Sequence, residues 1–297
     1  MTQSFERVKS RLDNIQSIKP LLSALRTLSM SEWQLALTKI EGIRQYEENF
    51  HQIIAEILPK VKFSRTKKSK NHKKNPSLAE RIILIVGTER GLCGRFNRIL
   101  AENTLTWIKD QGFSSYQIWA LGTRMVQELS RMGVTIDRRN PFQTNDISNY
   151  QLAYLAVQNW LSLYEEGAFN QFIIIFNRIA RGGQYSFTWR QLLPFEIQQF
   201  NKSAERSINI WPPPIIETDP QGIYHQIIDQ YIASTYYQTL LQSTAAENAS
   251  RYRLMEDAKE NALEIIKELK TMINIERKRR ITQEMQELAS GSGLLEK

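Results

Sequence analysis

The feature that most constrains the fold of this chain is a stretch of 68 residues, from Ile223 to Ser290, that contains neither glycine nor proline. As one continuous α-helix it would be about 100 Å long, because each residue adds about 1.5 Å. Asp219-Pro220 supplies a helix start, since proline fits the first turn, and Gly291 supplies a stop. No compact domain encloses a helix of that length, so the sequence predicts that it packs against a second long helix.

The N-terminal region, residues 1–58, is the candidate for that second helix. Its apolar residues recur at steps of three and four, which places them on one stripe of a helix. The stripe begins with Phe5, Val8, Leu12, Ile15, Ile18, Leu22, Leu25 and Leu28. Pro20 interrupts this pattern and predicts either a kink or a late helix start near that position. In the C-terminal stretch the apolar stripe keeps a near-heptad rhythm, which is typical of helices that wind around each other.

The region between the two predicted helices, residues 80–210, alternates strand-like and helix-like runs. The strands are predicted at Arg81–Val86, Tyr116–Leu121 and Phe172–Phe176, and the helices at Phe96–Asp110, Arg124–Met132 and Ile147–Tyr164. Such alternation predicts a parallel sheet covered by helices. The predicted organisation is an N-terminal helix over 1–58, a linker over 59–79, an α/β domain over 80–210 and a C-terminal helix over 211–297.

The net charge of +8 is concentrated in the predicted linker. Between Ile57 and Ala79 the chain has eight basic residues and no acidic one, so this segment accounts for the whole excess. They are Lys60, Lys62, Arg65, Lys67, Lys68, Lys70, Lys73 and Lys74. A segment of this composition cannot bury a core and is typical of a solvated linker. It also leaves open an alternative function, a nucleic-acid-binding coiled-coil protein that uses this basic linker.

Signals for catalysis or metal binding are weak. The glycine-rich turn from Gly87 to Gly94 follows a predicted strand, where it could cradle a phosphate or simply pack a helix against that strand. Its spacing differs from the dinucleotide-binding pattern, and no glycine is followed by lysine as a P-loop requires. The three histidines lie far apart, and Cys93 is the one cysteine. We therefore predict no catalytic residue, no metal site and no cofactor.

The cysteine count, the first residues and the length of the apolar runs predict the cellular compartment. A single cysteine excludes an internal disulfide and fits a reducing compartment. The first residues lack the apolar core of a signal peptide, and the longest apolar runs are too short to cross a bilayer. The sequence predicts a soluble protein on the cytoplasmic side.

Four consecutive cations, Arg277 to Arg280, stand near the end of the long C-terminal helix. Successive helical residues are about 100° apart, so four in a row surround the helix on every side. We call these four residues the basic cluster. Positive charge on all sides of a helix suits a partner that encloses it and offers carboxylates.

Five segments together resemble the gamma subunit of F-type ATP synthases. Residues 281–285 (Ile-Thr-Gln-Glu-Met) resemble a C-terminal family signature, and residues 246–251 (Ala-Glu-Asn-Ala-Ser-Arg) resemble a stretch upstream of it. Residues 88–94 (Thr-Glu-Arg-Gly-Leu-Cys-Gly) are similar to the family's Ser/Thr-Asp-Arg-Gly-Leu-Cys-Gly turn. Residues 191–194 and 217–220 also fall where the family places them. The order and spacing of these segments extend over nearly the whole chain.

The resemblance implies a fold and a function. The fold would be an antiparallel coiled coil of the N- and C-terminal helices with a Rossmann-like α/β domain inserted between them. The chain would be the non-catalytic central-stalk rotor, coupling ion translocation through the membrane c-ring to ATP synthesis or hydrolysis in the alpha/beta hexamer. Its partners would be the alpha, beta and epsilon subunits and the c-ring. It would bind no nucleic acid, and it would lie at the cytoplasmic face of the membrane, held there through the complex.

The resemblance also implies two contact regions. One region would meet the hexamer, and Glu217 would face the c-ring. The hexamer-contacting residues would be Arg277, Lys278, Arg279, Arg280, Thr282, Gln283 and Glu284.

Some positions depart from the family pattern. Glu32 replaces a basic residue of the N-terminal helix, and Pro20 falls where the family helix is normally uninterrupted. Residues 94–97 read Gly-Arg-Phe-Asn where the family commonly has Gly-Gly-Leu-Asn. These departures predict a divergent member, such as the rotor of a second, alternative F-type ATPase.

Overall fold

The computed structural model describes residues 2–61, 81–140, 149–195, 216 and 219–291 of the 297-residue chain. Two compact units are present, and each is described by itself. Unit 1 consists of Met1–Met30 together with Arg251–Lys297, and unit 2 consists of Ser31–Ser250. The helices and strands in chain order are α1 (Thr2–Ile57), η1 (Leu58–Lys60), β1 (Arg81–Val86), α2 (Phe96–Asp110), β2 (Gln117–Leu121), α3 (Thr123–Arg131), β3 (Arg138–Asn140), α4 (Tyr150–Glu165), β4 (Gln171–Ile179), η3 (Arg181–Gly183), β5 (Tyr185–Leu193) and α6 (Pro220–Gly291).

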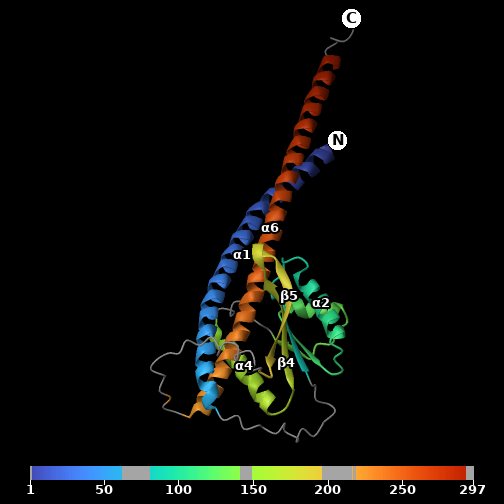
Figure 1. The fold of residues 1–297 in the computed structure, drawn as a ribbon. Helices are drawn as coiled ribbons and strands as arrows, with labels where there is room; N and C mark the ends of the chain where they lie inside the picture. The colour runs from blue at the N-terminus through green and yellow to red at the C-terminus, as the bar shows by residue number, and fades with distance from the viewer. Residues whose placement is uncertain (1, 62–80, 141–148, 196–215, 217–218, 292–297) are drawn as a thin grey trace. The chain divides into compact units, whose positions relative to one another are not determined.

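Unit 2 contains a five-stranded sheet in the order β3-β2-β1-β4-β5 (Figure 1). The first four strands in this order are parallel, with Leu84 opposite Trp119 on one side and Ile174 on the other. The predicted parallel sheet is therefore right for β1 to β4. It is wrong for β5, which runs antiparallel to β4. The physical reason is the short connection between these two strands, because a tight turn can only join antiparallel neighbours.

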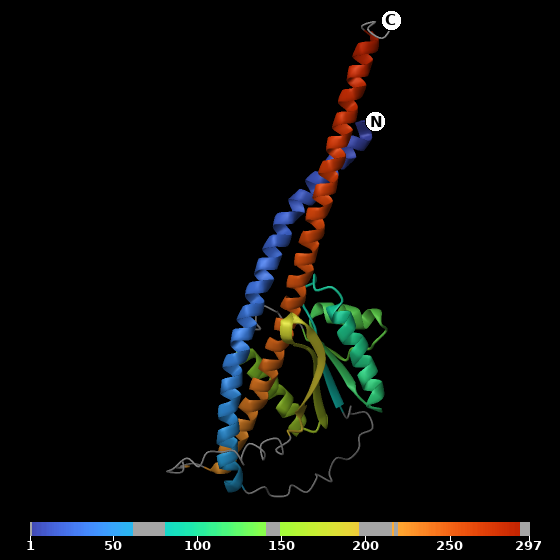
Figure 2. The same cartoon turned by 45° about the horizontal axis from the view of Figure 1, so that its top comes forward.

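The two faces of the sheet are covered by different helices of unit 2. Alternate residues of β1 and β4, such as Leu84 and Ile174, pack in a cluster with α4 and with residues of α1 and α6. The residues between them, such as Ile83 and Ile173, pack against α2 and α3. Figures 1 and 2 show α2 and α4 on opposite sides of the sheet. Strands buried on both faces read as continuous apolar runs, which is why the sequence marks them clearly.

The two long helices extend as the sequence predicts. α6 has 72 residues and begins at Pro220, where the Asp219 carboxylate accepts hydrogen bonds from the backbone N–H groups of Gln221 (3.3 Å) and Gly222 (3.1 Å). The predicted start and stop of this helix are both confirmed.

α1 has 56 residues and runs through Pro20, so the alternative of a late helix start is wrong. Pro20 and Gln16, four residues earlier, are both exposed, so water can reach the carbonyl that loses its helical partner.

In each unit a part of α1 packs against a part of α6. In unit 1, Leu12 lies in a buried cluster with Ile266 and Leu269, and the Arg26 guanidinium contacts the Glu256 carboxylate at 2.5 Å. In unit 2, Phe50 and Ile54 of α1 pack with Tyr224, Ile228 and Ile232 of α6. Within each unit the two segments therefore run antiparallel.

Gly42 lies at an exposed position inside α1, and a Cβ built on it would meet nothing within 4 Å. A glycine in a helix interior costs conformational entropy without a compensating contact. We expect Gly42→Ala to raise the free energy of unfolding of unit 2 by about 0.5–1 kcal/mol. Urea unfolding followed by tryptophan fluorescence measures this, and a loss of stability would show that Gly42 has a role the helix alone does not explain.

Candidate functional site

The basic cluster lies in unit 1, near the C-terminal end of α6. All four of its residues are exposed, as are Thr282, Gln283 and Glu284. Arg280 pairs with Glu284 at 3.0 Å on the same helix. Side chains of this kind stay largely solvated, so the intrahelical pair contributes little to stability. The cluster therefore leaves its positive charge available to a partner.

Large apolar side chains stand exposed among these charges. Ile281 is 50 % exposed, Met285 66 % and Leu288 73 %. At spacings of four and three they share one face of α6. An exposed apolar stripe within a charged helix indicates a surface that another molecule covers.

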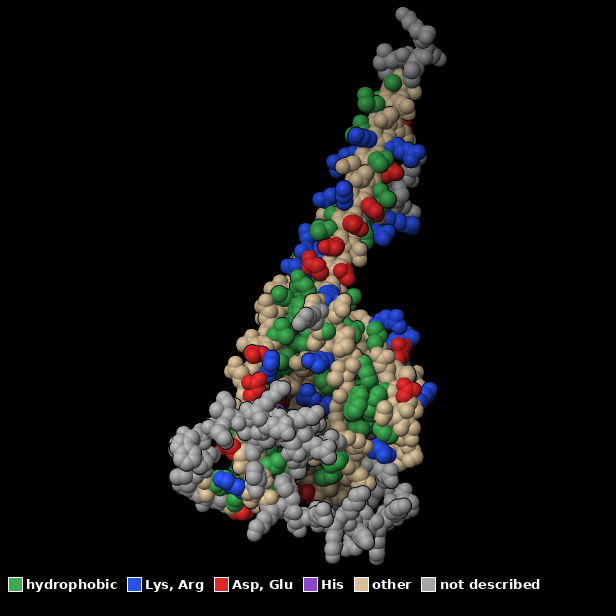
Figure 3. Space-filling view, in the orientation of Figure 1, with side chains coloured by type: hydrophobic (Ala, Val, Ile, Leu, Met, Phe, Trp, Pro, Cys, Tyr) green, Lys and Arg blue, Asp and Glu red, His purple; other side chains and the backbone are tan. Residues whose placement is uncertain are grey.

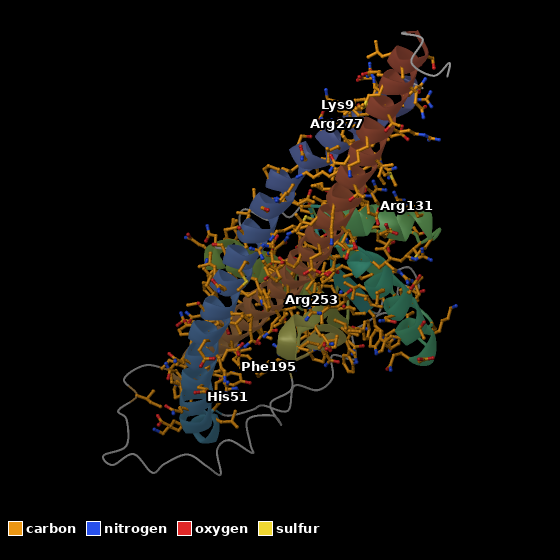
Figure 4. The ribbon with its side chains drawn as sticks, turned by 90° about the horizontal axis from the view of Figure 1, so that it is seen from above. Lys9, His51, Arg131, Phe195, Arg253 and Arg277 are labelled. Carbon is orange, nitrogen blue, oxygen red and sulfur yellow. The ribbon has the colours of Figure 1, made fainter. Side chains whose placement is uncertain are left out.

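A groove beside the basic cluster has a volume of about 350 Å³. Phe5 of α1 lines this groove together with residues of both charges from α6, which are Glu276, Arg277, Arg279, Arg280, Gln283, Glu284 and Glu287. Figure 3 shows Lys and Arg side chains along this part of α6, and Figure 4 labels Arg277 on α6 and Lys9 on α1. The structure therefore places Phe5, which the sequence marked only as part of the apolar stripe, beside the predicted contact residues.

Glu217, the residue expected to face the c-ring, lies outside the described residues. Most of the predicted basic linker, residues 62–79, lies outside them as well.

The glycine-rich turn after β1 is held by a compact hydrogen-bond network. The Thr88 backbone N–H donates to Asn97 Oδ1 (3.0 Å), and Asn97 Nδ2 donates to Thr88 Oγ1 (2.8 Å). A Cβ on Gly87 would come within 2.4 Å of the Met125 Cβ, so α3 packs directly on the backbone there. Of the two possibilities that the sequence left open for this turn, these contacts favour the packing of a helix against the strand.

The edge of the sheet where nucleotides bind in many parallel α/β folds is covered by α6. In such folds ligands sit beyond the carboxyl ends of the strands, where the strand order reverses. Here the reversal lies between β1 and β4. Ser243 donates to the Val86 carbonyl at the end of β1 (3.5 Å), and Ser250 donates to the Cys93 carbonyl (3.2 Å). Ala246 packs between them against Cys93 and Phe96. This arrangement leaves the turn serving helix packing rather than phosphate binding.

Cys93 is buried, with its Sγ 3.7 Å from Thr88 Oγ1 and 3.8 Å from Asn97 Nδ2. Its apolar neighbours are Phe96 and Ala246, so it packs as a small buried side chain. Among the residues that the structure describes, no three His, Cys, Asp or Glu side chains gather in a way that could hold a metal ion. No helix in the described ranges is long and apolar enough to cross a membrane.

Glu32, which departs from the family pattern, has a partner in unit 2. Its carboxylate lies 3.6 Å from the Arg90 guanidinium of the turn. The substitution of an acid for a base thus gives this turn an ion pair with α1.

His51 of α1 lies against the Tyr231 ring of α6, with ring centroids 5.6 Å apart. Burial lowers the pKa of His51, and Glu48 opposes this shift in part. The unfolded chain therefore binds the proton more readily than the folded one, and unit 2 loses stability as the pH falls below the ordinary histidine pKa of about 6.5.

We expect the His51→Gln variant to lose less stability than the wild-type chain between about pH 8 and pH 5, because only the wild type can protonate this ring. Urea unfolding at a series of pH values measures the difference. Parallel pH profiles for the two chains would show that His51 does not contribute.

Comparison with known proteins places this geometry in context. A family model described as ATP synthase matches residues 4–295. A rotor chain of the Euglena gracilis mitochondrial ATP synthase is similar in fold, with a TM-score of 0.62 and 11 % identity over 95 % of this chain and 100 % of that chain. A chain of the OSCP/F1/c-ring part of the same enzyme gives a TM-score of 0.64 and 12 % identity, over 99 % and 95 %. A chain from the central stalk and c-ring of the Tetrahymena thermophila mitochondrial ATP synthase gives 0.53 and 17 %, over 80 % and 99 %.

Proposed function

The chain belongs to the F-type ATP synthase gamma family, and from this premise we propose that it is the rotor of the central stalk. As a rotor it couples ion translocation through a membrane c-ring to ATP synthesis or hydrolysis in an alpha/beta hexamer. The chain itself does no nucleotide chemistry. In this role α1 and α6 form an antiparallel coiled coil with the α/β domain inserted between them, Glu217 faces the c-ring, and an epsilon subunit completes the stalk at the cytoplasmic face of the membrane.

The observation that carries this proposal is the character of α6 around the basic cluster. Four exposed cations surround the helix, and Ile281, Met285 and Leu288 stand exposed beside them. A partner that encloses the helix would bury the apolar side chains and bring carboxylates close to the cations. Because the attraction between charges depends on distance, an asymmetric ring of carboxylates gives an energy that varies with the angle of the helix.

Neither alternative class gains support. A nucleotide-dependent enzyme would use the turn at Gly87 to Gly94, but α6 covers the edge of the sheet beside it. A nucleic-acid-binding protein would use the basic linker, and the matched family and the similar chains give that function no support.

Co-purification tests the proposal directly. The tagged full-length chain, expressed in its own organism, should bring down alpha, beta, epsilon and c subunits, and the assembly should hydrolyse ATP while the chain alone does not. ATP hydrolysis by the purified chain alone, or nucleic acid in place of ATP synthase subunits, would overturn it.

A matched pair of double variants tests the role of the basic cluster. We expect Arg277→Gln with Lys278→Gln to weaken binding of the chain to its alpha/beta hexamer about tenfold or more, because two charged contacts are lost. Lys267→Gln with Lys270→Gln removes the same charge from exposed positions of the same helix outside the cluster, and should change binding by less than about twofold. Equal losses in the two variants would mean that only net charge matters.

A further inference from the structure

A cavity of about 430 Å³ opens in unit 2 between β5, α1 and α6. Its volume lies within the range of about 300–1,000 Å³ that is usual for small-molecule sites. The walls come from three segments that are far apart in the sequence. Figure 4 labels the wall residue Phe195 and also His51. The rings of both residues pack edge to face with the ring of Tyr231.

One wall of the cavity carries a carboxylate whose ionised form is disfavoured by burial. Glu47 of α1 accepts a hydrogen bond from Gln238 Nε2 at 2.7 Å and a longer one from Thr235 Oγ1 at 3.4 Å. Burial raises the pKa of Glu47, and Arg190 and these two hydrogen bonds offset the shift only in part. An ionised carboxylate can accept about four hydrogen bonds, so Glu47 keeps acceptor capacity toward the cavity.

Arg190 of β5 supplies the opposite charge in the same cavity. Its Nη1 donates to Gln238 Oε1 at 3.0 Å, so one amide group holds both charged side chains. Within the described residues, Glu47 and Arg190 form no direct ion pair at 4.0 Å or less. A guanidinium has five N–H donors, and a carboxylate-bearing ligand could accept two of them in parallel.

Apart from Gln191 and Thr235, the rest of the wall is apolar and aromatic. The rings of Phe195 and Tyr231 meet edge to face at 5.5 Å. Trp189 also borders the cavity, but its ring packs on Trp107 of α2 at 5.3 Å. The other apolar wall residues are Leu192, Pro194 and Ile232. This wall suits a large apolar group rather than a sugar or a phosphate.

From this arrangement we propose that the cavity binds a zwitterionic α-amino acid with a large apolar side chain. The ammonium group donates to Glu47, the carboxylate accepts from Arg190, and the side chain lies against Phe195 and Tyr231. A ligand with both charges matches a cavity that has one acid and one base separated by an amide. A plain cation would face Arg190, and a plain anion would face Glu47. This site is independent of the rotor function.

Isothermal titration calorimetry of the full-length chain with three related compounds tests the proposal. L-Phenylalanine has both charges, 2-phenylethylamine keeps the ammonium, and 3-phenylpropionate keeps the carboxylate. We expect L-phenylalanine to bind at least tenfold more tightly than either analogue.

Two variants assign the charges. Glu47→Gln should weaken L-phenylalanine and 2-phenylethylamine at least tenfold but leave 3-phenylpropionate within about twofold. Arg190→Met should weaken L-phenylalanine and 3-phenylpropionate instead. Phe195→Ala, which removes one ring of the aromatic pair, should weaken all three. Circular dichroism confirms that each variant is folded.

The outcomes are decisive in either direction. No heat of binding with L-phenylalanine at about 10 mM, or equal binding of all three compounds, overturns the proposal. L-Phenylalanine affinity that survives in both charge variants overturns it as well. Should one charge variant fail to fold, the other variant and Phe195→Ala still decide.

Discussion

The Gly122→Ala variant should lose about 3–5 kcal/mol of stability in unit 2, because two separate costs add at this position. Gly122 precedes α3 with a φ of 96°, a conformation that side chains rarely adopt. A Cβ there would also come within 2.7 Å of the Thr88 carbonyl oxygen, which is backbone and cannot move aside. That carbonyl accepts a hydrogen bond from the Arg124 backbone N–H at 3.0 Å, so relief of the clash would break the contact between α3 and the turn.

Gly112→Ala is the matched control for this prediction. Gly112 also has a positive φ, 62°, but a Cβ on it would meet nothing within 4 Å. It should cost only the conformational part, about 1 kcal/mol. All six tryptophans fall between residues 31 and 250, so fluorescence in urea reports on unit 2. Equal losses in the two variants would show that the close approach to Thr88 is unimportant.

Phe172→Ala should cost about 3–5 kcal/mol, the usual range for removal of a fully buried aromatic side chain. Phe172 of β4 is 0 % exposed and stacks on Trp160 of α4 at 4.5 Å. It also meets the edges of the Trp119 ring at 5.7 Å, and so joins two strands and a helix. Neighbouring rings cannot close a cavity of that size without leaving their own contacts.

Leu155→Ala on α4 serves as the control, because Leu155 is 59 % exposed and should change stability by less than about 0.5 kcal/mol. Urea unfolding of both variants gives the comparison. A loss below about 1 kcal/mol for Phe172→Ala would mean that this cluster repacks and does not hold β4 to α4.

Local features of the fold could be predicted from the sequence. α2 was predicted with its observed bounds, β1 likewise, and the start and stop of α6 followed from Asp219-Pro220 and Gly291. These signals work because hydrophobic periodicity and helix capping depend on residues close together in the chain.

β5 escaped prediction because its first seven residues are partly buried or exposed, without a regular alternation, and include polar side chains such as Arg190 and Gln191. β3 escaped because it has three residues, two of them arginine.

The candidate sites divide in the same way. The basic cluster is contiguous, so four neighbouring letters suffice to mark it, and their exposure agrees with the prediction. No sequence pattern predicts the cavity at Glu47, because its charged residues are far apart in the chain. Glu47 comes from α1, Arg190 from β5, and Gln238, which bonds to both, from α6.

By itself the sequence determined the length and limits of the helices, the buried parallel strands and the placement of charge, since each depends on interactions between near neighbours. Tertiary structure alone decided that β5 runs antiparallel, that α6 covers the carboxyl edge of the sheet, and that Glu47 and Arg190 share one cavity. These depend on which distant segments meet, and that is set by the packing of the whole core, to which each local pattern contributes only a part.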